Sequence, residues 1–548
     1  MNGAELMVKC LENEGVEYIF GIPGEENLAF LEALRTSSIK LILTRHEQAA
    51  GFMAATYGRL TGKPGVCLAT LGPGATNFVT SVSYAFLGGM PCLFITGQKP
   101  IKSSKQGRFQ IINVVSMMAP ITKMTRQIVG ADSIATLVRE SFRVAMQEKS
   151  GPVHLELPED IADEETKVIP FPVTPLQKKQ ASHDSLKEAA EIIKRAKNPL
   201  LLIAAASNRH QEVSPALEYF IEQTGIHFFS TQMGKGAANE FHPRCLGTAA
   251  LSDHDYLHCA ISKADVILNV GHDVVEKPPF FMRREGPVVI HLSYFHAVFD
   301  EVYFPQHEVI GDIADSMQRL ATLVVPNSLA GDGYFNLLKN EVDKNVYERA
   351  VPPTFPYTPQ QLTRALRRLM VKDSVLSLDN GMYKIWFARN YRSINSHSVL
   401  LDNALATMGA GLPVAIAAKI ILPEKKVVAV CGDGGFMMNS QELETAIRLK
   451  LDLTILLLRD DGFGMIKWKQ GGMGLPNFGL DFGNPDFVKY AESYGAKGYR
   501  VKDQEHLAEV LEHCMNTPGV HLIDLPIDYA ENESVLIEEL KRKTCLLG

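Results

Sequence analysis

The sequence lacks the patterns that mark metal-binding cysteine clusters, membrane spans and nucleic-acid-binding proteins. Its eight cysteines are scattered, without Cys-x-x-Cys or a His/Cys cluster, which is typical of small buried residues in a reducing compartment such as the cytoplasm. No run of eighteen or more apolar residues and no basic–apolar signal peptide is present, so we expect neither a membrane span nor export. A net charge of −7 and a pI near 6.2 give no electrostatic reason to expect nucleic acid as a partner.

What the sequence does contain is alternation of apolar strands with periodic helices. The chain has 548 residues, of which 46% are hydrophobic and 21% charged, so several domains with large cores are expected. Strand–helix alternation predicts an α/β fold with parallel sheets flanked by helices. Proline-rich or irregular connections near 162–184 and 326–359 predict three consecutive domains, at 1–165, 184–326 and 358–548.

The most informative stretch is residues 426–464. We predict a buried strand at Val427–Cys431, a glycine turn with Asp433, a helix at Ser440–Leu449 and a buried strand at Leu453–Leu458 that ends in a second acidic turn. In a parallel sheet both turns lie at the ligand-binding edge. Asn439, with Glu442 three residues on, is expected to cap the helix and aim free N–H groups toward the glycine turn.

The pattern suggests a diphosphate neutralised by Mg²⁺. Glycines let backbone approach a phosphate closely, and Asp433 and Asp460 offer hard oxygen ligands. A Gly-Asp-Gly sequence taken alone is more often an ordinary turn, because Gly and Asp are turn residues. The second acidic turn, one strand–helix–strand unit later, favours the functional interpretation.

A second group of candidate residues follows strands of the first domain. Glu47 comes just after a predicted strand, where an acidic residue is also explained by the dipole at a helix N-terminus. Its neighbours at the same predicted edge favour a ligand site; they are Ile22, Pro23, Gly24, Thr70, Pro73 and Asn77.

Several motifs resemble those of thiamin-diphosphate enzymes. The Gly-Asp-Gly turn and the later acidic turn resemble the cofactor signature, although Arg459-Asp460 stands where Asn-Asn is usual. The sequence GIPG, then RHEQAAGFMAATYGRLTGKPGV, GPG and GPVHLELPED, looks like the pyrimidine-binding domain of these enzymes. ATMGAGLPVAIAA is similar to their diphosphate-binding domain. The matches follow the family order and span nearly the whole chain.

The resemblance implies a thiamin-diphosphate-enzyme fold, with pyrimidine-binding, central and diphosphate-binding domains. It implies that Glu47 faces N1′ of the aminopyrimidine and that Met408 wedges the cofactor into its bent form. It implies metal binding by the side chains of Asp433 and Asp460 and the carbonyl of Gly462. Further cofactor contacts are implied for Gly381, Met382, Gly432, Gly434, Gly435, Phe463, Gly464 and Met465. Active sites are expected at the interface of a homodimer or homotetramer, so that Glu47 serves a metal held by the other subunit.

Within the family the chain resembles the acetolactate synthases. Gly107–Val115 lacks the His-His pair of pyruvate decarboxylases, and Ile466 stands where those enzymes have a glutamate. Phe109-Gln110 resembles acetolactate synthases, which implies a catalytic role for Gln110. The expected reaction is decarboxylation of pyruvate and ligation of the hydroxyethyl unit to a second 2-oxo acid, giving 2-acetolactate. Alternatives are a carboligase or lyase acting on an acyl-CoA or sulfoacetaldehyde, or a non-catalytic paralogue.

Some relatives bind FAD in the central domain, and here we expect it to be absent. The turn Ala204–Ser207 lacks the glycines that let backbone N–H groups reach a pyrophosphate. The Arg-rich element of the flavin-containing relatives is replaced by Gly271–Glu276. Gly234 and Gly236 could in principle supply another glycine turn.

Overall fold

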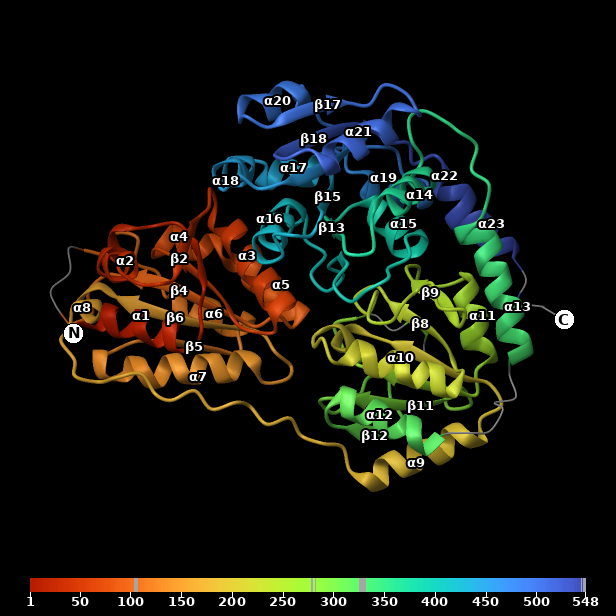
Figure 1. Ribbon diagram of the computed structural model, residues 1–548, viewed down its shortest axis with the longest axis horizontal. Coiled ribbons are helices and arrows are strands. Elements are labelled where there is room, and N and C mark those ends of the chain that lie inside the picture. The colour runs from red at the N-terminus through yellow and green to blue at the C-terminus, as the bar shows by residue number, and fades with distance from the viewer. Residues whose placement is uncertain (103–106, 277–278, 281, 325–331, 544, 546–548) are drawn as a thin grey trace. The chain divides into compact units, whose positions relative to one another are not determined.

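Three parallel six-stranded sheets organise the chain, so the predicted α/β fold class is confirmed (Figure 1). The computed structural model describes residues 1–102, 107–276, 279–280, 282–324, 332–543 and 545. Pro326, the predicted end of the central domain, lies outside these residues. All strand pairs are parallel, and most central strands are buried along their whole length, as expected when helices cover both faces of a sheet.

The first sheet has the strand order β2-β1-β3-β4-β6-β5. Its strands are β1 (Tyr18–Gly21), β2 (Lys40–Leu43), β3 (Gly65–Ala69), β4 (Cys92–Gln98), β5 (Met124–Gln127) and β6 (Pro152–Pro158). One face is covered by α1 (Gly3–Asn13), α2 (Leu28–Arg35) and α7 (Ile134–Met146). The other face is covered by α3 (Glu47–Thr61) and α5 (Val79–Gly88) (Figure 1). The short helices α4 (Gly72–Asn77), α6 (Val114–Met118) and α8 (Glu159–Ala162) lie in connections.

The second sheet has the order β12-β11-β10-β7-β8-β9. Its strands are β7 (Pro199–Ile203), β8 (His227–Thr231), β9 (Cys245–Ala249), β10 (Val266–Val270), β11 (Val288–Ser293) and β12 (His307–Ile310). The core on one face includes α9 (His183–Arg195), α10 (Val213–Thr224) and α12 (Ile313–Val324). The core on the other face includes α11 (Tyr256–Lys263) and α13 (Asp332–Val342).

The third sheet has the order β14-β13-β15-β16-β18-β17. Its strands are β13 (Val375–Leu378), β14 (Val399–Leu400), β15 (Val427–Gly432), β16 (Leu453–Arg459), β17 (Lys497–Arg500) and β18 (Val520–Pro526). One core contains residues of α14 (Pro359–Leu369), α15 (Met382–Asn390) and α21 (His506–Asn516). The remaining helices of this part of the sequence are α16 (Gly411–Ile421), α17 (Asp433–Asn439), α18 (Glu442–Arg448), α19 (Gly464–Gly472), α20 (Phe487–Ser493), α22 (Glu531–Glu533) and α23 (Glu539–Arg542).

The expected helix cap at Asn439 is wrong. A helix, α17, begins at Asp433 itself and ends at Asn439, so the N–H groups next to the glycine turn belong to this earlier helix. The following helix, α18, begins at Glu442 without a capping side-chain bond. Asn439 instead donates from Nδ2 to Oε1 of Gln48 at 3.0 Å. Its Oδ1, the atom that a cap would use, accepts from Nε2 of Gln441 at 3.3 Å.

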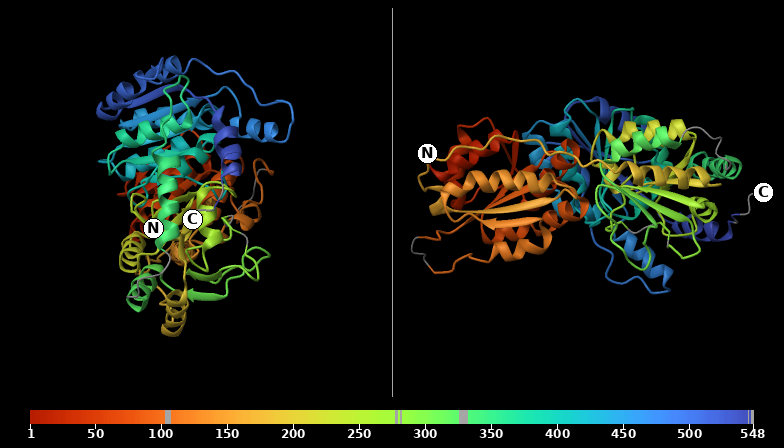
Figure 2. Two further views of the ribbon diagram at one scale, coloured as in Figure 1. Left: turned by 90° about the vertical axis from the view of Figure 1, so that its right-hand side faces the viewer. Right: turned by 90° about the horizontal axis from the view of Figure 1, so that it is seen from below.

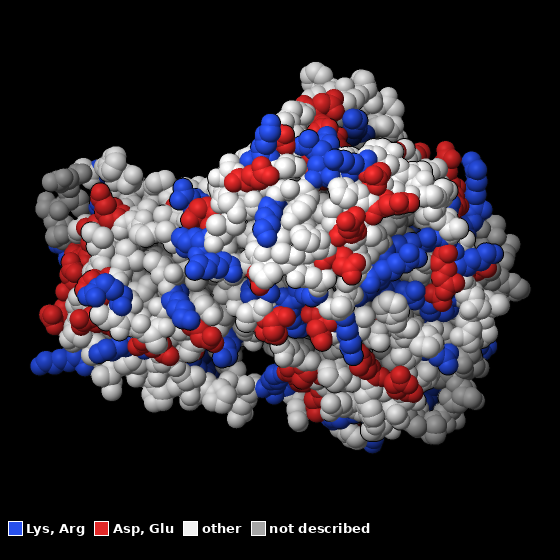
Figure 3. All heavy atoms as spheres, turned by 45° about the horizontal axis from the view of Figure 1, so that its top comes forward, with Lys and Arg blue, Asp and Glu red and all other residues white. Residues whose placement is uncertain are grey.

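The chain forms two compact units. The first contains Met1–Gln177, Leu412–Glu424 and Asn439–Leu451, and the second contains Lys178–Gly411, Lys425–Met438 and Asp452–Gly548. Residues 166–182 form neither helix nor strand (Figure 2), as expected for a linker. The boundaries 1–165, 184–326 and 358–548 remain a prediction. Acidic and basic side chains are interspersed on the face shown in Figure 3. Among the described residues, no helix has the length and apolarity needed to cross a membrane.

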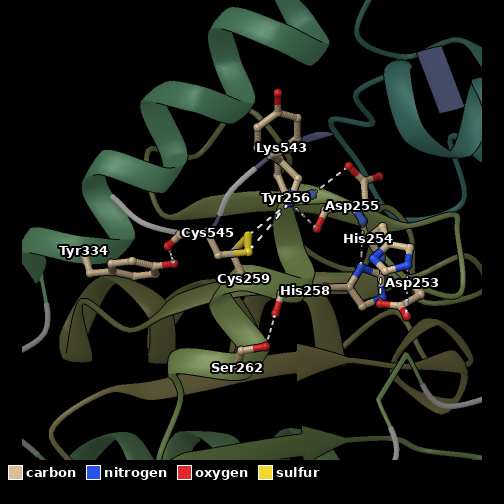
Figure 4. The surroundings of a disulfide bond; sticks show 10 residues. All are labelled: Asp253, His254, Asp255, Tyr256, His258, Cys259, Ser262, Tyr334, Lys543 and Cys545. Atoms are coloured by element: carbon tan, nitrogen blue, oxygen red, sulfur yellow. Dashed lines mark hydrogen bonds and ion pairs between the residues drawn. A yellow bond between two sulfur atoms is a disulfide. The ribbon is translucent and has the colours of Figure 1, made fainter. Parts of the chain in front are cut away.

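The interpretation of all eight cysteines as free buried residues is wrong for two of them. Cys259 on α11 and Cys545 near the C-terminus form a disulfide (Figure 4). The other six cysteines are free and buried. Because Cys259 and Cys545 are 286 residues apart in the sequence, no local spacing pattern could predict that they pair.

Candidate active site

A cavity of about 240 Å³ lies at the carboxyl ends of the strands of the third sheet. The cavity is lined by every residue of this part of the chain that was predicted to contact the cofactor or metal. These residues are Gly381, Met382, Met408, Gly432, Asp433, Gly434, Gly435, Asp460, Gly462, Phe463, Gly464 and Met465. The helices α15, α17 and α19 begin at Met382, Asp433 and Gly464, which line this cavity. Unpaired N–H groups at helix starts attract anions, so the cavity suits a phosphate-bearing ligand.

Two carboxylates, the buried Asp433 and the half-buried Asp460, lie close together in this cavity. Asp433 follows β15 and Asp460 follows β16, which are neighbouring strands. Burial, and next the charge of Asp433, raises the pKa of Asp460 to about 7, and burial also raises the pKa of Asp433. A divalent cation would relieve the repulsion between these groups, so the residues fit a metal. Among the described residues, no group of three or more His, Cys, Asp or Glu is placed to hold a metal ion.

Hydrogen bonds orient the Asp433 carboxylate. Its Oδ1 accepts from the N–H of Gly434 at 2.8 Å. Its Oδ2 accepts from the N–H of Asp461 at 2.8 Å and from Nδ2 of Asn484 at 2.8 Å. Asn484 also donates to Oδ1 of Asp461 at 2.8 Å, so it joins the two acidic turns. Sequence reasoning missed Asn484, because it lies beyond both motifs in a loop with no recognisable pattern.

Glycine is required at several positions of the cavity wall. A Cβ atom at Gly435 would lie 2.4 Å from Oδ2 of Asp379, and one at Gly464 would lie 2.5 Å from Oδ2 of Asp460. Both distances are far below van der Waals contact. Any larger residue would therefore push into the acidic groups that the cavity holds in place.

Tyr383 stands among these glycines and was not predicted as a site residue. Its buried hydroxyl accepts a hydrogen bond from the N–H of Gly432 at 2.9 Å. Its ring would lie 2.5 Å from a Cβ at Gly381 and 3.1 Å from one at Gly432. Burial raises the pKa of Tyr383, so the hydroxyl stays neutral. Asn380, Lys384, Ala406, Ile466 and Tyr529 also line the cavity without having been predicted to bind the cofactor.

In the first unit, Glu47 is the first residue of α3 and is 9% exposed. Its Oε2 accepts from Nδ2 of Asn77 at 2.9 Å. A Cβ at Gly74 would lie 3.3 Å from Oε1 of Glu47 and 2.9 Å from Cγ2 of Thr70. The structure thus brings Glu47, Thr70 and Asn77 together at the carboxyl edge of the first sheet.

The turn before Glu47 is held by Glu442, a residue of α18 in the same unit. Oε1 of Glu442 accepts from the N–H of Arg45 at 3.0 Å, and Oε2 accepts from the Thr445 hydroxyl at 2.6 Å. Burial raises the pKa of Glu442 to about 7. From the sequence, Glu442 was expected only to help cap a helix. Its bond to Arg45 could not be predicted, because the two residues are 397 positions apart in the sequence.

Gly24 and Thr70 are packed against each other, since a Cβ at Gly24 would lie 2.3 Å from Cβ of Thr70. Ile22 and Pro23 precede Gly24 at the end of β1, so they share this edge. The Thr70 hydroxyl donates to the buried carboxylate of Glu26, which also pairs with Lys99 at 2.7 Å. Burial opposes ionisation of Glu26, but the bonds from Lys99 and Thr70 lower its pKa overall. Sequence reasoning missed both Glu26 and Lys99.

Gln110 lies in an exposed loop with φ +59°, a conformation that is uncommon for residues other than glycine. Its carbonyl oxygen would lie 2.7 Å from a Cβ at Gly72, which precedes Pro73 and has φ +42°. The backbone at Gln110 therefore lies against the turn at the start of α4, close in space to the Glu47 group.

Three stretches of the chain match models of one enzyme family. Residues 1–117 match the thiamine pyrophosphate enzyme N-terminal TPP binding domain, residues 186–320 match the central domain and residues 379–525 match the C-terminal TPP binding domain.

Relatives align along nearly the whole chain. The acetolactate synthase of Bacillus subtilis (strain 168) is 32% identical over 548 residues, with 99% of this chain and 96% of the relative covered. The catabolic acetolactate synthase of Raoultella terrigena is 32% identical, covering 97% and 96%. A probable acetolactate synthase large subunit of Methanococcus aeolicus is 31% identical, covering 96% and 92%. With matches to all three domains and to relatives along their length, the chain belongs to the family of thiamine pyrophosphate enzymes that includes these acetolactate synthases.

Proposed function

We propose that this protein is an acetolactate synthase that uses thiamin diphosphate and Mg²⁺. The observation that carries the proposal is the cavity of the third sheet, where glycines, helix starts and two carboxylates meet around one space. The substrate would be pyruvate, with a second 2-oxo acid as acceptor. The products would be 2-acetolactate and CO₂.

The cofactor would supply a carbanion-stabilising thiazolium ring, and the chain would hold and orient it. Asp433, Asp460 and the carbonyl of Gly462 would hold Mg²⁺ against the diphosphate. Met408 would press on the bend of the cofactor. Glu47, kept in place by Asn77, would share a proton with N1′ of the aminopyrimidine.

We propose carboligation as the outcome because Ile466 gives the cavity an apolar wall. Ile466 would supply no proton at this position, which would favour ligation to a second carbonyl group over protonation. Gln110 would contact the acceptor.

The active assembly would be a homodimer or homotetramer with the active sites at the dimer interface. Apolar side chains after α19 support this, because Met473 and Phe478 are 74% and 84% exposed in the single chain. Large exposed apolar groups of this kind are typical of protein interfaces. We propose a cytoplasmic location, supported by the six free buried cysteines.

A direct test is incubation of the pure protein with thiamin diphosphate, Mg²⁺ and single 2-oxo acids, followed by product identification. We expect CO₂ and 2-acetolactate from pyruvate alone. Consumption of sulfoacetaldehyde or of an acyl-CoA, with no product from pyruvate alone, would favour another carboligase or lyase. No turnover with any of these, despite cofactor binding, would identify a non-catalytic paralogue.

A further inference from the structure

Met408 belongs to a loop that has no helix or strand of its own to hold it. Residues 401–410 connect β14 to α16, and Ala406 within them has φ +54°. A methionine side chain is flexible, so it can press on a ligand only if its backbone is fixed. The contacts that fix this backbone come from three residues at the end of β13 and the start of α15.

The peptide groups on both sides of Met408 are held by two consecutive residues. Asn380 donates from Nδ2 to the carbonyl of Thr407 at 2.7 Å. Asp379 accepts at Oδ2 from the N–H of Gly409 at 3.1 Å. Asp379 is 1% exposed and also accepts from the N–H of Asn380 at 2.8 Å. Asn380 and Asp379 therefore hold the loop backbone on both sides of Met408.

Lys384, in the first turn of α15, sets the orientation of the Asn380 side-chain amide. Its Nζ donates to Oδ1 of Asn380 at 2.7 Å, which leaves Nδ2 of Asn380 directed at Thr407. An ammonium group has only donors, so it can bond the oxygen of the amide and not the nitrogen. Lys384 therefore acts on the loop through Asn380.

The same ammonium group holds the start of the loop directly. Nζ donates to the carbonyl of Asp402 at 3.0 Å and to Oδ1 of Asn403 at 3.0 Å, so all three donors are used. The Asp402 carboxylate accepts from the N–H groups of Ala404 and Ala406 at 3.0 and 2.7 Å, which shapes the turn between Lys384 and Met408. Burial lowers the pKa of Lys384 to about 8, opposed by Asp402 and Asp379, so the group is mostly charged at pH 7.

We propose that Lys384 is a positioning residue for Met408: through Asn380 it fixes the peptide before Met408, while Asp379 fixes the peptide after it. The inference rests on the proposed function, in which Met408 sets the bent shape of thiamin diphosphate. Lys384 lines the cavity, but its three donors are bound to Asn380, Asp402 and Asn403, so its ammonium group is committed to the loop rather than to the diphosphate. Its loss should therefore slow activation of the cofactor more than it weakens cofactor binding.

The test compares Lys384→Met, which removes all three donors, with the milder Lys384→Gln, Asn380→Ala and the double variant Lys384→Met/Asn380→Ala. The readouts are hydrogen–deuterium exchange at C2 of bound thiamin diphosphate and the Kd of the cofactor in saturating Mg²⁺. Lys489→Met is a matched control, because Lys489 lies on α20 in the same part of the chain with its side chain 81% exposed. Melting temperatures identify variants that are not folded.

We expect Lys384→Met to slow C2 exchange by about 10- to 100-fold, the size of effect that small misplacements of catalytic groups produce. The cofactor Kd should change much less, and the control should match the wild type. The double variant should be little slower than Lys384→Met alone, because both changes break the same connection. If Lys384→Met does not fold, Lys384→Gln decides by the same criteria.

Wild-type exchange in Lys384→Met, or fully additive effects in the double variant, would overturn the inference. A change in Kd without a change in exchange would also overturn it, since that result assigns Lys384 to cofactor binding. Failure of the wild-type protein to bind thiamin diphosphate or to release CO₂ from pyruvate would instead contradict the proposed function.

Discussion

Glu47 is the residue whose proposed role can be tested by changing one atom. Glu47→Gln keeps the shape and an oxygen that can accept from Asn77, but removes the group that would share a proton with N1′. We expect nearly normal cofactor binding and a loss of activity of about 10²–10⁴-fold, as is typical of acid–base groups. The measurement is C2 exchange of bound thiamin, with Glu165→Gln as a control because its side chain is 83% exposed. Unchanged exchange in Glu47→Gln would show that Glu47 has another role.

Asp460 places a second carboxylate beside Asp433, where relatives usually have a neutral amide. Asp460→Asn removes the repulsion that helps to raise the pKa of Asp460 to about 7, and with it part of the attraction for a cation. We expect the variant to reach full activity only at a higher Mg²⁺ concentration. Titration of activity with Mg²⁺ tests this, with Asp253→Asn as a control because its side chain is 70% exposed. An identical Mg²⁺ requirement in Asp460→Asn and the wild type would mean that Asp460 is not a ligand.

Ile466 is proposed to influence whether the protein releases acetaldehyde or acetolactate. It is 50% exposed and lines the cavity, so a longer acidic side chain can be placed there without opening the core. Ile466→Glu should raise the amount of acetaldehyde relative to acetolactate, because the hydroxyethyl unit then has a nearby proton donor. Product ratios by chromatography provide the measurement, and Ile466→Gln, which matches the shape without the acid, is the control. Equal ratios in all three proteins would place control of protonation elsewhere.

At the level of a single structural element, the turn after β7 bears on flavin binding. Glu276 is fully buried, and its carboxylate accepts from the N–H of Ala205 at 2.8 Å and of Met233 at 3.3 Å. These N–H groups lie at the ends of β7 and β8, where a dinucleotide would place its phosphates. An internal carboxylate thus already uses the donors that a pyrophosphate would need.

We therefore expect the purified protein to be colourless and to turn over without added FAD. Visible absorbance after gel filtration and activity with and without FAD are the measurements. Flavin that co-purifies in an amount close to one equivalent per chain would contradict this expectation. It would also require Glu276 to move, because its carboxylate and the phosphates cannot share the same N–H groups.

At the scale of the whole chain, the Cys259–Cys545 disulfide joins the C-terminal end to α11, a helix that packs on the second sheet (Figure 4). Lys543 lies beside it, with Nζ 3.1 Å from Sγ of Cys259 and 3.4 Å from the carbonyl of Asp255. Asp255 in turn pairs with Arg389 of α15 at 2.7 Å, with both side chains buried. The end of the chain is therefore connected to the helix that carries Lys384 and lines the cavity.

We expect six free thiols in the unfolded, unreduced protein and eight after reduction. Reduction should lower the free energy of unfolding by about 2–4 kcal/mol, because the disulfide closes a long loop. Thiol titration and denaturant unfolding with and without reductant are the measurements, and Cys545→Ser should behave like the reduced protein. Eight reactive thiols before reduction would show that the bond does not form in solution.

Much of the fold could be predicted because its signals are local. The strands predicted at Val427–Cys431 and Leu453–Leu458 are continuous apolar runs, and the structure has them at Val427–Gly432 and Leu453–Arg459, each with one residue more at its end. Edge strands such as β5 and β17 were missed. They contain the sequences MTRQ and KGYR, and their polar residues, which suit the edge of a sheet, hide the strand pattern.

The sequence by itself determined the glycines, the acidic turns and the strand ends of the candidate site, because the conformation of a turn depends on residues that are adjacent in the sequence. Only the tertiary structure decided which groups orient them. Asn484 bonds Asp433, Glu442 bonds the turn before Glu47, and Lys384 holds the loop of Met408 through Asn380. These partners are polar residues whose types are common in any sequence. The function of Glu442 and Lys384 follows from burial, which removes water as a competing partner for their hydrogen bonds.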